Sequence, residues 1–139
     1  MAVEVVQFKD SAFGGFFKPD DVKGAVAIVI EPTNYEENVP AYEEGKLENR
    51  VYADVSVFHD LAKLEAADPE VAEDMVINKS VLAKQTKDLI GKAVVVQVEK
   101  RQPKKGNAYW SFKPVDPQIQ EQVEAYLEAR ESAANDLIG

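Results

Sequence analysis

Apolar and polar positions follow one another along the chain in a pattern that predicts a mainly β protein. The clearest segment is residues 50–59, RVYADVSVFH, where every odd position from 51 to 57 is a small apolar residue, the period of a half-buried strand. Residues 22–31, VKGAVAIVIE, are almost continuously apolar and end at a proline, which favours a buried strand over a helix. We expect three further strands at residues 75–77, 92–99 and 109–113.

Helical spacing and capping residues predict helices at three places. A stripe of side chains between Val81 and Ile90 falls on one helical face, and Gly91 follows where a helix ends in a left-handed residue. Asp116-Pro117 supplies an N-cap and a first-turn proline for a last helix. Residues 60–73 predict a short helix, whereas the polar residues 32–49, with two prolines and no period, predict a long surface loop.

The charge of the chain is unevenly distributed. Its net value of −9 argues against a polyanionic partner, because affinity for nucleic acid comes largely from neutralised phosphates. Residues 79–113, however, contain nine basic residues against Asp88 and Glu99, a local charge of +7 that leaves −16 for the rest of the chain. An acidic protein with one basic segment can hold an anion at that segment.

The densest part of this basic segment is the turn and strand at residues 100–113, KRQPKKGNAYWSFK. Lysine and arginine bind phosphates, and aromatic side chains stack on bases with about 1–3 kcal/mol for each base. The composition therefore predicts a nucleic-acid site. Its candidate residues are Lys100, Arg101, Lys104, Lys105, Asn107, Tyr109, Trp110, Phe112 and Lys113.

Alternation along the predicted strand limits this site. Tyr109 and Trp110 point to opposite faces, so at most one side serves the ligand. The other side, for which Trp110 with Phe112 is the candidate, belongs to the core. The alternative interpretation, a solvated basic turn followed by an ordinary aromatic strand, stays open.

A second group of rings lies near the N-terminus, after residues 2–8, which are rich in strand-forming side chains. Phe13, Phe16 and Phe17 precede Lys18, and aromatic faces beside a cation suit stacked bases, so Phe16, Phe17 and Lys18 join the candidate set. The alternative, which the burial preference of phenylalanine favours, is a lid that closes one end of the core.

Residues for enzymatic chemistry are sparse. Cysteine is absent, which excludes disulfides and thiolate metal sites and favours a cytoplasmic setting, and His59 is the single histidine. No phosphate-binding glycine loop or nucleophile elbow occurs, so we expect no catalytic residue, no cofactor and no metal. No apolar run approaches the roughly 20 residues of a membrane span, and the first residues lack a signal-peptide pattern. We therefore expect no membrane contact.

The order of the predicted elements is strand, long loop, strand, short strand, helix, strand, basic hairpin, strand and tail. This order is similar to that of the OB-fold, a five-stranded barrel with a helix between its third and fourth strands. We expect an OB-like β-barrel domain over residues 1–116, with a helix before the fourth strand. Residues 117–139 should form a C-terminal amphipathic helix and an acidic tail.

With its basic hairpin, the chain resembles the short single-stranded-DNA-binding proteins of tailed bacteriophages. The resemblance covers about residues 22–115 and rests on KGAVAIVIEP, RVYADVSVFHD and LIGKAVVVQVEKRQPKKGNAYWSFKP. It implies non-enzymatic binding of single-stranded DNA in phage replication or recombination, in the cytoplasm of the host cell. The loop after the first strand and residues 100–108 would then flank the binding groove.

The same resemblance implies that the acidic C-terminal tail recruits replication or recombination proteins. Bacterial relatives of this kind end in an acidic tip with a terminal phenylalanine, whereas this chain ends in DLIG, and its first long loop is acidic. An alternative function is that of a phage structural or interaction protein, such as a capsid decoration protein or an accessory subunit. Its basic hairpin would then contact an acidic protein surface. Both interpretations leave a homo-oligomer open.

Overall fold

The computed structural model describes residues 15–41 and 43–138, which form a mainly β protein with four helices. The strands are β1 (Ala27–Pro40), β2 (Leu47–Phe58), β3 (Glu70–Ile77), β4 (Val94–Arg101) and β5 (Tyr109–Pro114). The helices are α1 (Pro19–Val22), α2 (Leu61–Glu65), α3 (Ser80–Thr86), which continues into the 3-10 turn Lys87–Leu89, and α4 (Pro117–Ile138). The predicted strand residues 2–8 and the ring of Phe13 lie outside the described residues.

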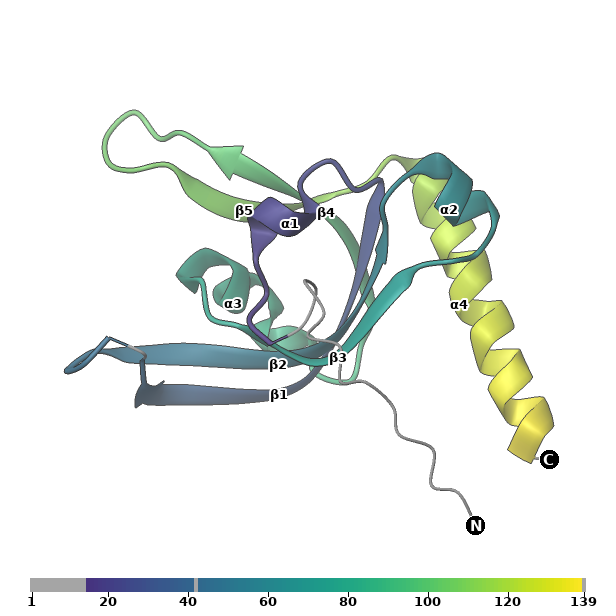
Figure 1. The fold of residues 1–139 in the computed structure, drawn as a ribbon, viewed down its shortest axis with the longest axis horizontal. Coiled ribbons are helices and arrows are strands. Elements are labelled where there is room, and N and C mark those ends of the chain that lie inside the picture. Colours follow the sequence, from purple (N-terminus) through teal and green to yellow (C-terminus); the bar gives the residue numbers. More distant parts are fainter. Residues whose placement is uncertain (1–14, 42, 139) are drawn as a thin grey trace, which may run out of the picture.

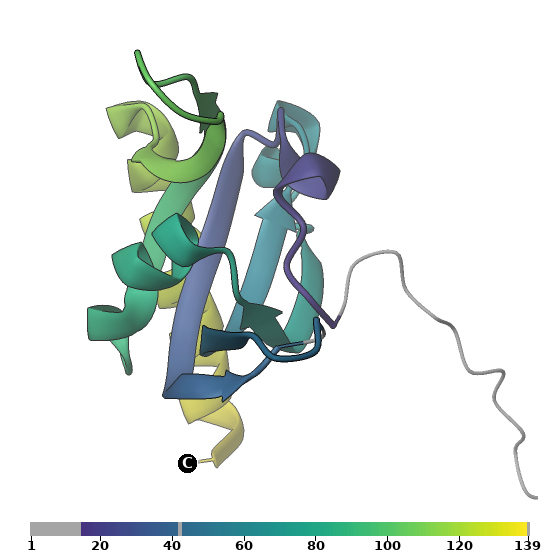
Figure 2. The same cartoon turned by 90° about the vertical axis from the view of Figure 1, so that its left-hand side faces the viewer.

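The five described strands form one antiparallel sheet with the order β3-β2-β1-β4-β5 (Figures 1 and 2). β1 is the central strand and pairs with β2 on one side and with β4 on the other. The predicted helix before the fourth strand and the predicted C-terminal helix are both present as α3 and α4. The predicted barrel is not confirmed, because no ladder joins the described edge strands β3 and β5 and the sheet is not closed.

Backbone groups on the two edge strands already have other hydrogen-bond partners, which explains why the sheet stays open between β3 and β5. On β3, Val76 accepts from Phe17 N at 2.8 Å and donates to Gly15 O at 2.8 Å. On β5, Phe112 N donates to the Gln85 side chain of α3 at 2.9 Å, and the Gln85 amide donates to Phe112 O at 3.3 Å. Since buried backbone groups need a partner, these bonds remove the need for β3 and β5 to pair.

Two cores lie on the two faces of the sheet. Ile28 and Ile30 of β1 belong to the first core, to which α1, α3 and Phe17 contribute. Ala27 and Val29 belong to the second core, on the face that carries α2 and α4 (Figure 1). Both faces of β1 are therefore buried here, which explains why its sequence is continuously apolar rather than alternating.

The predicted loop at residues 32–49 is wrong. β1 continues to Pro40 and β2 begins at Leu47, so most of this segment belongs to a long hairpin. The pairing shifts register between Pro32 and Asn34 and again between Glu36 and Val39, and such bulges accommodate a proline within a ladder. The outer part of this hairpin, beyond Pro32, is mostly exposed, so it is held by backbone hydrogen bonds without the apolar period that would reveal a strand in the sequence.

Element boundaries also differ near residues 19–26 and 60–77. Residues 19–22 form α1, and the first strand begins at Ala27 rather than at residue 22. The predicted helix at residues 60–73 ends at Glu65, and the predicted short strand is the end of β3, which begins at Glu70. The Asp60 carboxylate caps α2 by accepting from Lys63 N at 2.8 Å.

The last helix begins at Pro117, as predicted, and the Asp116 carboxylate accepts from Gln118 N at 2.9 Å. α4 packs on the second core through the buried Val123 and through Tyr126. The ring of Tyr126 packs edge-on against that of Phe58, with 5.2 Å between the ring centroids. The helix continues to Ile138, so the predicted acidic tail has a helical backbone up to that residue.

Candidate nucleic-acid interface

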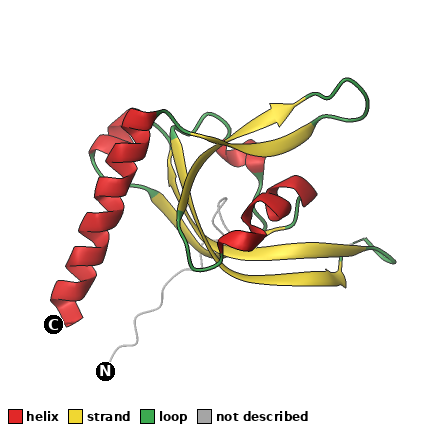
Figure 3. Cartoon of the chain, turned by 180° about the vertical axis from the view of Figure 1, so that it is seen from behind, coloured by secondary structure: helices red, strands yellow, loops and turns green. Residues whose placement is uncertain are grey.

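The basic segment of the sequence becomes one continuous region of the molecule. β4 and β5 form a hairpin with an unbroken register from Val96↔Pro114 to Arg101↔Tyr109. The hydrogen bonds of Gln85 to Phe112 and to Ser111 Oγ attach α3 to the edge of this hairpin. The lysines of α3 and the cations of the hairpin are therefore carried by neighbouring elements (Figure 3).

Trp110 lies on the same face of the hairpin as the first core. It is half-buried and packs against that core, while Phe112 is buried within it. Lys100 is the cross-strand neighbour of Trp110, and its ammonium lies 5.6 Å from the ring centroid. This distance is within the range of a cation–π contact. The predicted assignment of Phe112 to the core is confirmed, and Trp110 keeps part of its ring accessible.

The opposite face of the hairpin carries Tyr109, which is exposed, and its cross-strand neighbour Arg101. Glu99 neutralises much of this face: its carboxylate lies 2.6 Å from Arg101 Nε and 3.9 Å from Lys113 Nζ. The hydrogen bond to Glu99 raises the pKa of Arg101. Two cations thus share one carboxylate, and the face keeps a single net positive charge.

The turn between the strands, residues 102–108, carries the exposed side chains of Lys104, Lys105 and Asn107. Gly106 has a φ of 99°, a left-handed conformation that suits glycine. The Gln102 amide donates to Gly106 O at 3.3 Å across the turn. Among the side chains of residues 15–41 and 43–134, no carboxylate lies at ion-pair distance from Lys104 or Lys105.

The N-terminal candidates separate into core and surface. Phe17 is 2 % exposed and its ring centroid lies 5.8 Å from that of Phe112, so it closes the core as the lid interpretation predicts. Phe17 and Phe112 are therefore not available to stack on bases. Phe16 is exposed beside β3, with the Arg50 guanidinium 5.6 Å from its ring centroid, and Lys18 is exposed just before α1.

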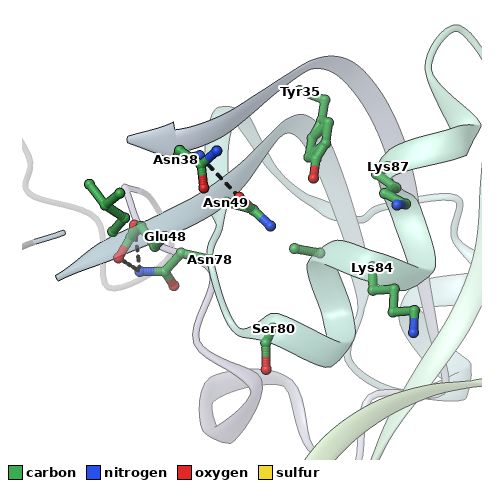
Figure 4. A pocket seen from close by; sticks show the side chains of 10 residues that line it. Tyr35, Asn38, Glu48, Asn49, Asn78, Ser80, Lys84 and Lys87 are labelled. Carbon is green, nitrogen blue, oxygen red and sulfur yellow. Dashed lines mark hydrogen bonds between the residues drawn. The ribbon is translucent and has the colours of Figure 1, made fainter. Parts of the chain in front are cut away.

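A pocket of about 450 Å³ between the β1–β2 hairpin and α3 was not predicted as a site (Figure 4). Tyr35 on β1 and the lysines Lys84 and Lys87 line it together with polar side chains from β2. Burial, and then the nearby charges of Glu37 and Asp88, raise the pKa of Tyr35. The sequence signal was the basic segment itself, but the spacing of its lysines on α3 does not reveal Tyr35 as their neighbour.

No group of three or more potential metal ligands occurs among the described residues. His59 lies at the surface, where its Nε2 is 3.6 Å from a Glu70 carboxylate oxygen. None of the helices in the described part of the chain is long and apolar enough to span a bilayer.

Comparisons of the chain with protein-family models, with curated proteins and with solved structures found no match. Inferences about function therefore depend on the residues described above and on their arrangement.

Proposed function

We propose that this protein binds single-stranded DNA without catalysing a reaction, and that it acts in phage DNA replication or recombination. The observation that carries the proposal is the pairing of Lys100 with the partly buried Trp110, next to a turn that presents Lys104 and Lys105. Such a combination offers phosphates several cations and offers a base one aromatic surface. Single strands expose both groups at once, whereas a duplex hides its bases from stacking.

The strand lies on the Trp110 face of the hairpin in this proposal. On the Tyr109 face, a phosphate would have to compete with Glu99 for Arg101 and Lys113. On the Trp110 face, Lys100 contacts an aromatic ring, which leaves its charge uncompensated. The difference in charge between the two faces therefore favours binding on the Trp110 face, where the accessible ring is that of Trp110.

The fold is compatible with this function. An open five-stranded antiparallel sheet with a helix between β3 and β4 resembles a partly open OB barrel, a fold that binds oligonucleotides. The rings of Phe17 and Phe112 fill the space between the unpaired edges, so the hairpin extends from a packed core. A rigid support of this kind lowers the entropic cost of binding.

The net charge of −9 restricts the site rather than forbidding it. Exposed glutamates on the β1–β2 hairpin and on α4 repel phosphates, so a bound strand is directed to the basic hairpin. In the same proposal, the exposed acidic side chains of α4 contact replication or recombination proteins. These side chains are Glu121, Glu124, Glu128 and Glu131.

Titration with oligo-dT at two salt concentrations tests the proposal, because Trp110 is the single tryptophan and reports on its own surroundings. We expect quenching of its fluorescence and an affinity that falls with salt. Three phosphate contacts, at Lys100, Lys104 and Lys105, predict a slope of log K against log salt of about −2. Absence of both quenching and a gel shift at low salt would contradict the proposal, and co-purification with capsids would then favour a structural role.

A further inference from the structure

The pocket between α3 and the β1–β2 hairpin brings together basic, aromatic and amide side chains. Lys84 and Lys87 border it from α3 and the following 3-10 turn, Tyr35 from β1, and Asn49 from β2. Its volume of about 450 Å³ falls within the range of about 300–1,000 Å³ that is usual for small-molecule sites.

The two lysines give the pocket its positive charge. Neither ammonium has a carboxylate at ion-pair distance among the described residues. The acid that lines the pocket, Glu48, already accepts from Arg50 Nε at 2.7 Å and from the Asn78 amide at 3.2 Å. The charge of Glu48 is therefore compensated. The charges of Glu37 and Asp88 act on Tyr35, so the part of the pocket that suits an anion is the side lined by the two lysines.

Tyr35 gives the pocket an aromatic wall. Figure 4 shows its ring directed from β1 toward α3, with the hydroxyl end in the pocket. The ring packs against the first core, so it is held in place before any ligand arrives. The Asn49 side-chain oxygen Oδ1 accepts from Asn38 N at 3.1 Å. The NH2 group of the same side chain is therefore left as a donor at this wall of the pocket.

The pocket and the basic hairpin are connected through α3. Gln85, next to Lys84 in the chain, is hydrogen-bonded to Phe112 of β5, while Ala83 and Lys84 line the pocket. Figures 1 and 2 show α3 between the two hairpins, both of which project on the same side of the molecule. A chain of phosphates that leaves Lys100 can thus continue along α3 without crossing the acidic α4.

We propose that this pocket holds one nucleotide of the bound strand, its phosphate between Lys84 and Lys87 and its base against Tyr35. The inference rests on the proposed binding of single-stranded DNA and adds a second contact to it. The ligand is a nucleotide unit of an extended strand, because a cationic edge and an aromatic wall in one pocket match the two parts of such a unit. The strand is then held at two places, the hairpin and the pocket, with α3 between them.

The test compares Lys84→Gln/Lys87→Gln with the wild type in titrations of dT12 at several salt concentrations. Loss of the one phosphate that the two lysines neutralise should reduce the magnitude of the salt slope by about 0.7 and lower affinity about 5-fold at 0.1 M salt. Lys63→Gln/Lys92→Gln is the matched control, since it removes the same charge from α2 and from the pocket beside α4. This control should leave the salt slope unchanged.

Tyr35 provides a second measurement that does not depend on charge. Tyr35→Ala should weaken dT12 binding about 5- to 150-fold, whereas Tyr35→Phe, which keeps the ring, should bind like the wild type. Melting curves identify any variant whose loss of binding comes from unfolding. If Tyr35→Ala unfolds, the Lys84/Lys87 variant, whose changes are at the surface, tests the pocket instead.

The possible results separate the two proposals. If the wild type binds and the Lys84/Lys87 variant has the same salt slope as the wild type, the pocket is not a nucleotide site, and the hairpin proposal stands. Equal losses in the Lys84/Lys87 variant and in the Lys63/Lys92 control would also overturn the pocket. A wild type that does not bind dT12 at low salt overturns the proposed function itself.

Discussion

The β1–β2 and β4–β5 hairpins are built alike and charged oppositely. Both are antiparallel, both extend beyond the core on the same side of the molecule, and α3 lies between them. The described part of the first carries exposed glutamates at positions 36, 37, 43 and 44, whereas the second carries Lys100, Arg101, Lys104 and Lys105. A shared backbone arrangement therefore supports two surfaces with different partners, and the side chains decide which of them can hold a polyanion.

The two hairpins also differ in the contacts that hold their strands in place. The β4–β5 pairing keeps one register throughout, and the side chains at its base are buried. The β1–β2 pairing contains two bulges and a left-handed Asn38, with a φ of 56°. In the outer part of this hairpin, the Arg50 guanidinium donates to Glu48 on the same strand and, across the hairpin, to Pro40 O of β1 at 3.2 Å. Apolar packing positions the basic hairpin, whereas local polar contacts shape the acidic one.

Reversing the charge of the basic turn should have the largest effect. Lys104→Glu/Lys105→Glu removes two phosphate contacts, which is worth about 25-fold in affinity at 0.1 M salt, and adds repulsion that increases the loss. The variant should fold like the wild type, because both side chains are exposed. Anisotropy of a labelled oligo-dT measures the affinity. A variant that binds as tightly as the wild type would remove the basic turn from the site.

Loss of the aromatic surface should come next. Trp110→Ala removes the ring that lies beside Lys100. Because this ring is partly buried, we expect about a 5- to 30-fold weaker complex, near the lower end of the usual range for stacking. Trp110→Phe, which keeps a ring, should recover most of the affinity. Tyr109→Ala on the opposite face should change the affinity less than twofold. If Tyr109→Ala has the larger effect, the strand binds on the other face of the hairpin.

Changing the acidic hairpin tests whether position matters as well as charge. Glu43→Lys/Glu44→Lys raises the net charge by four, yet it places the new cations at the tip of the β1–β2 hairpin. We expect a gain in oligo-dT affinity of less than about tenfold, because screening at 0.15 M salt limits such charges to about 8 Å. A gain that matches the loss in the Lys104/Lys105 variant would mean that overall charge controls binding.

The smallest effect should come from the carboxylate that divides the basic hairpin. Glu99→Gln releases Arg101 and Lys113 from their shared partner, which predicts an affinity about two- to fivefold higher and a slightly steeper salt slope. The pairs are partly exposed, so little stability should be lost, and thermal melting checks this. A decrease in affinity would show that Glu99 positions the hairpin rather than competing with phosphate.

Particular residues explain which features could be predicted from the sequence. The strand at residues 50–59 was predictable because one of its faces is uniformly apolar, and the structure buries Val51, Ala53, Val55 and Val57. The helix that begins at Pro117 was predictable from its cap. The extension of β1 to Pro40 was not, because its residues beyond Pro32 are largely exposed and show no period.

The candidate site shows the same division. The cations and rings of residues 100–113 were evident as composition, and alternation correctly placed Tyr109 and Trp110 on opposite faces of the strand. The neutralising role of Glu99 could not be read from its position, because it depends on the rotamers of side chains on two paired strands. The burial of Phe17 against Phe112 joins segments 95 positions apart, which no local pattern reveals.

By itself, the sequence determined the features that depend on neighbouring residues: the core strands, the basic turn, the cap of α4 and the contrast between an acidic chain and its one basic segment. Only the tertiary structure decided how the edges of the sheet are satisfied, which hairpin face keeps its charge, and that Tyr35 stands opposite Lys84 and Lys87. The physical reason is that periodicity and capping act within a few residues, whereas hydrogen-bond partners and charge neighbours depend on which distant segments the packing brings together.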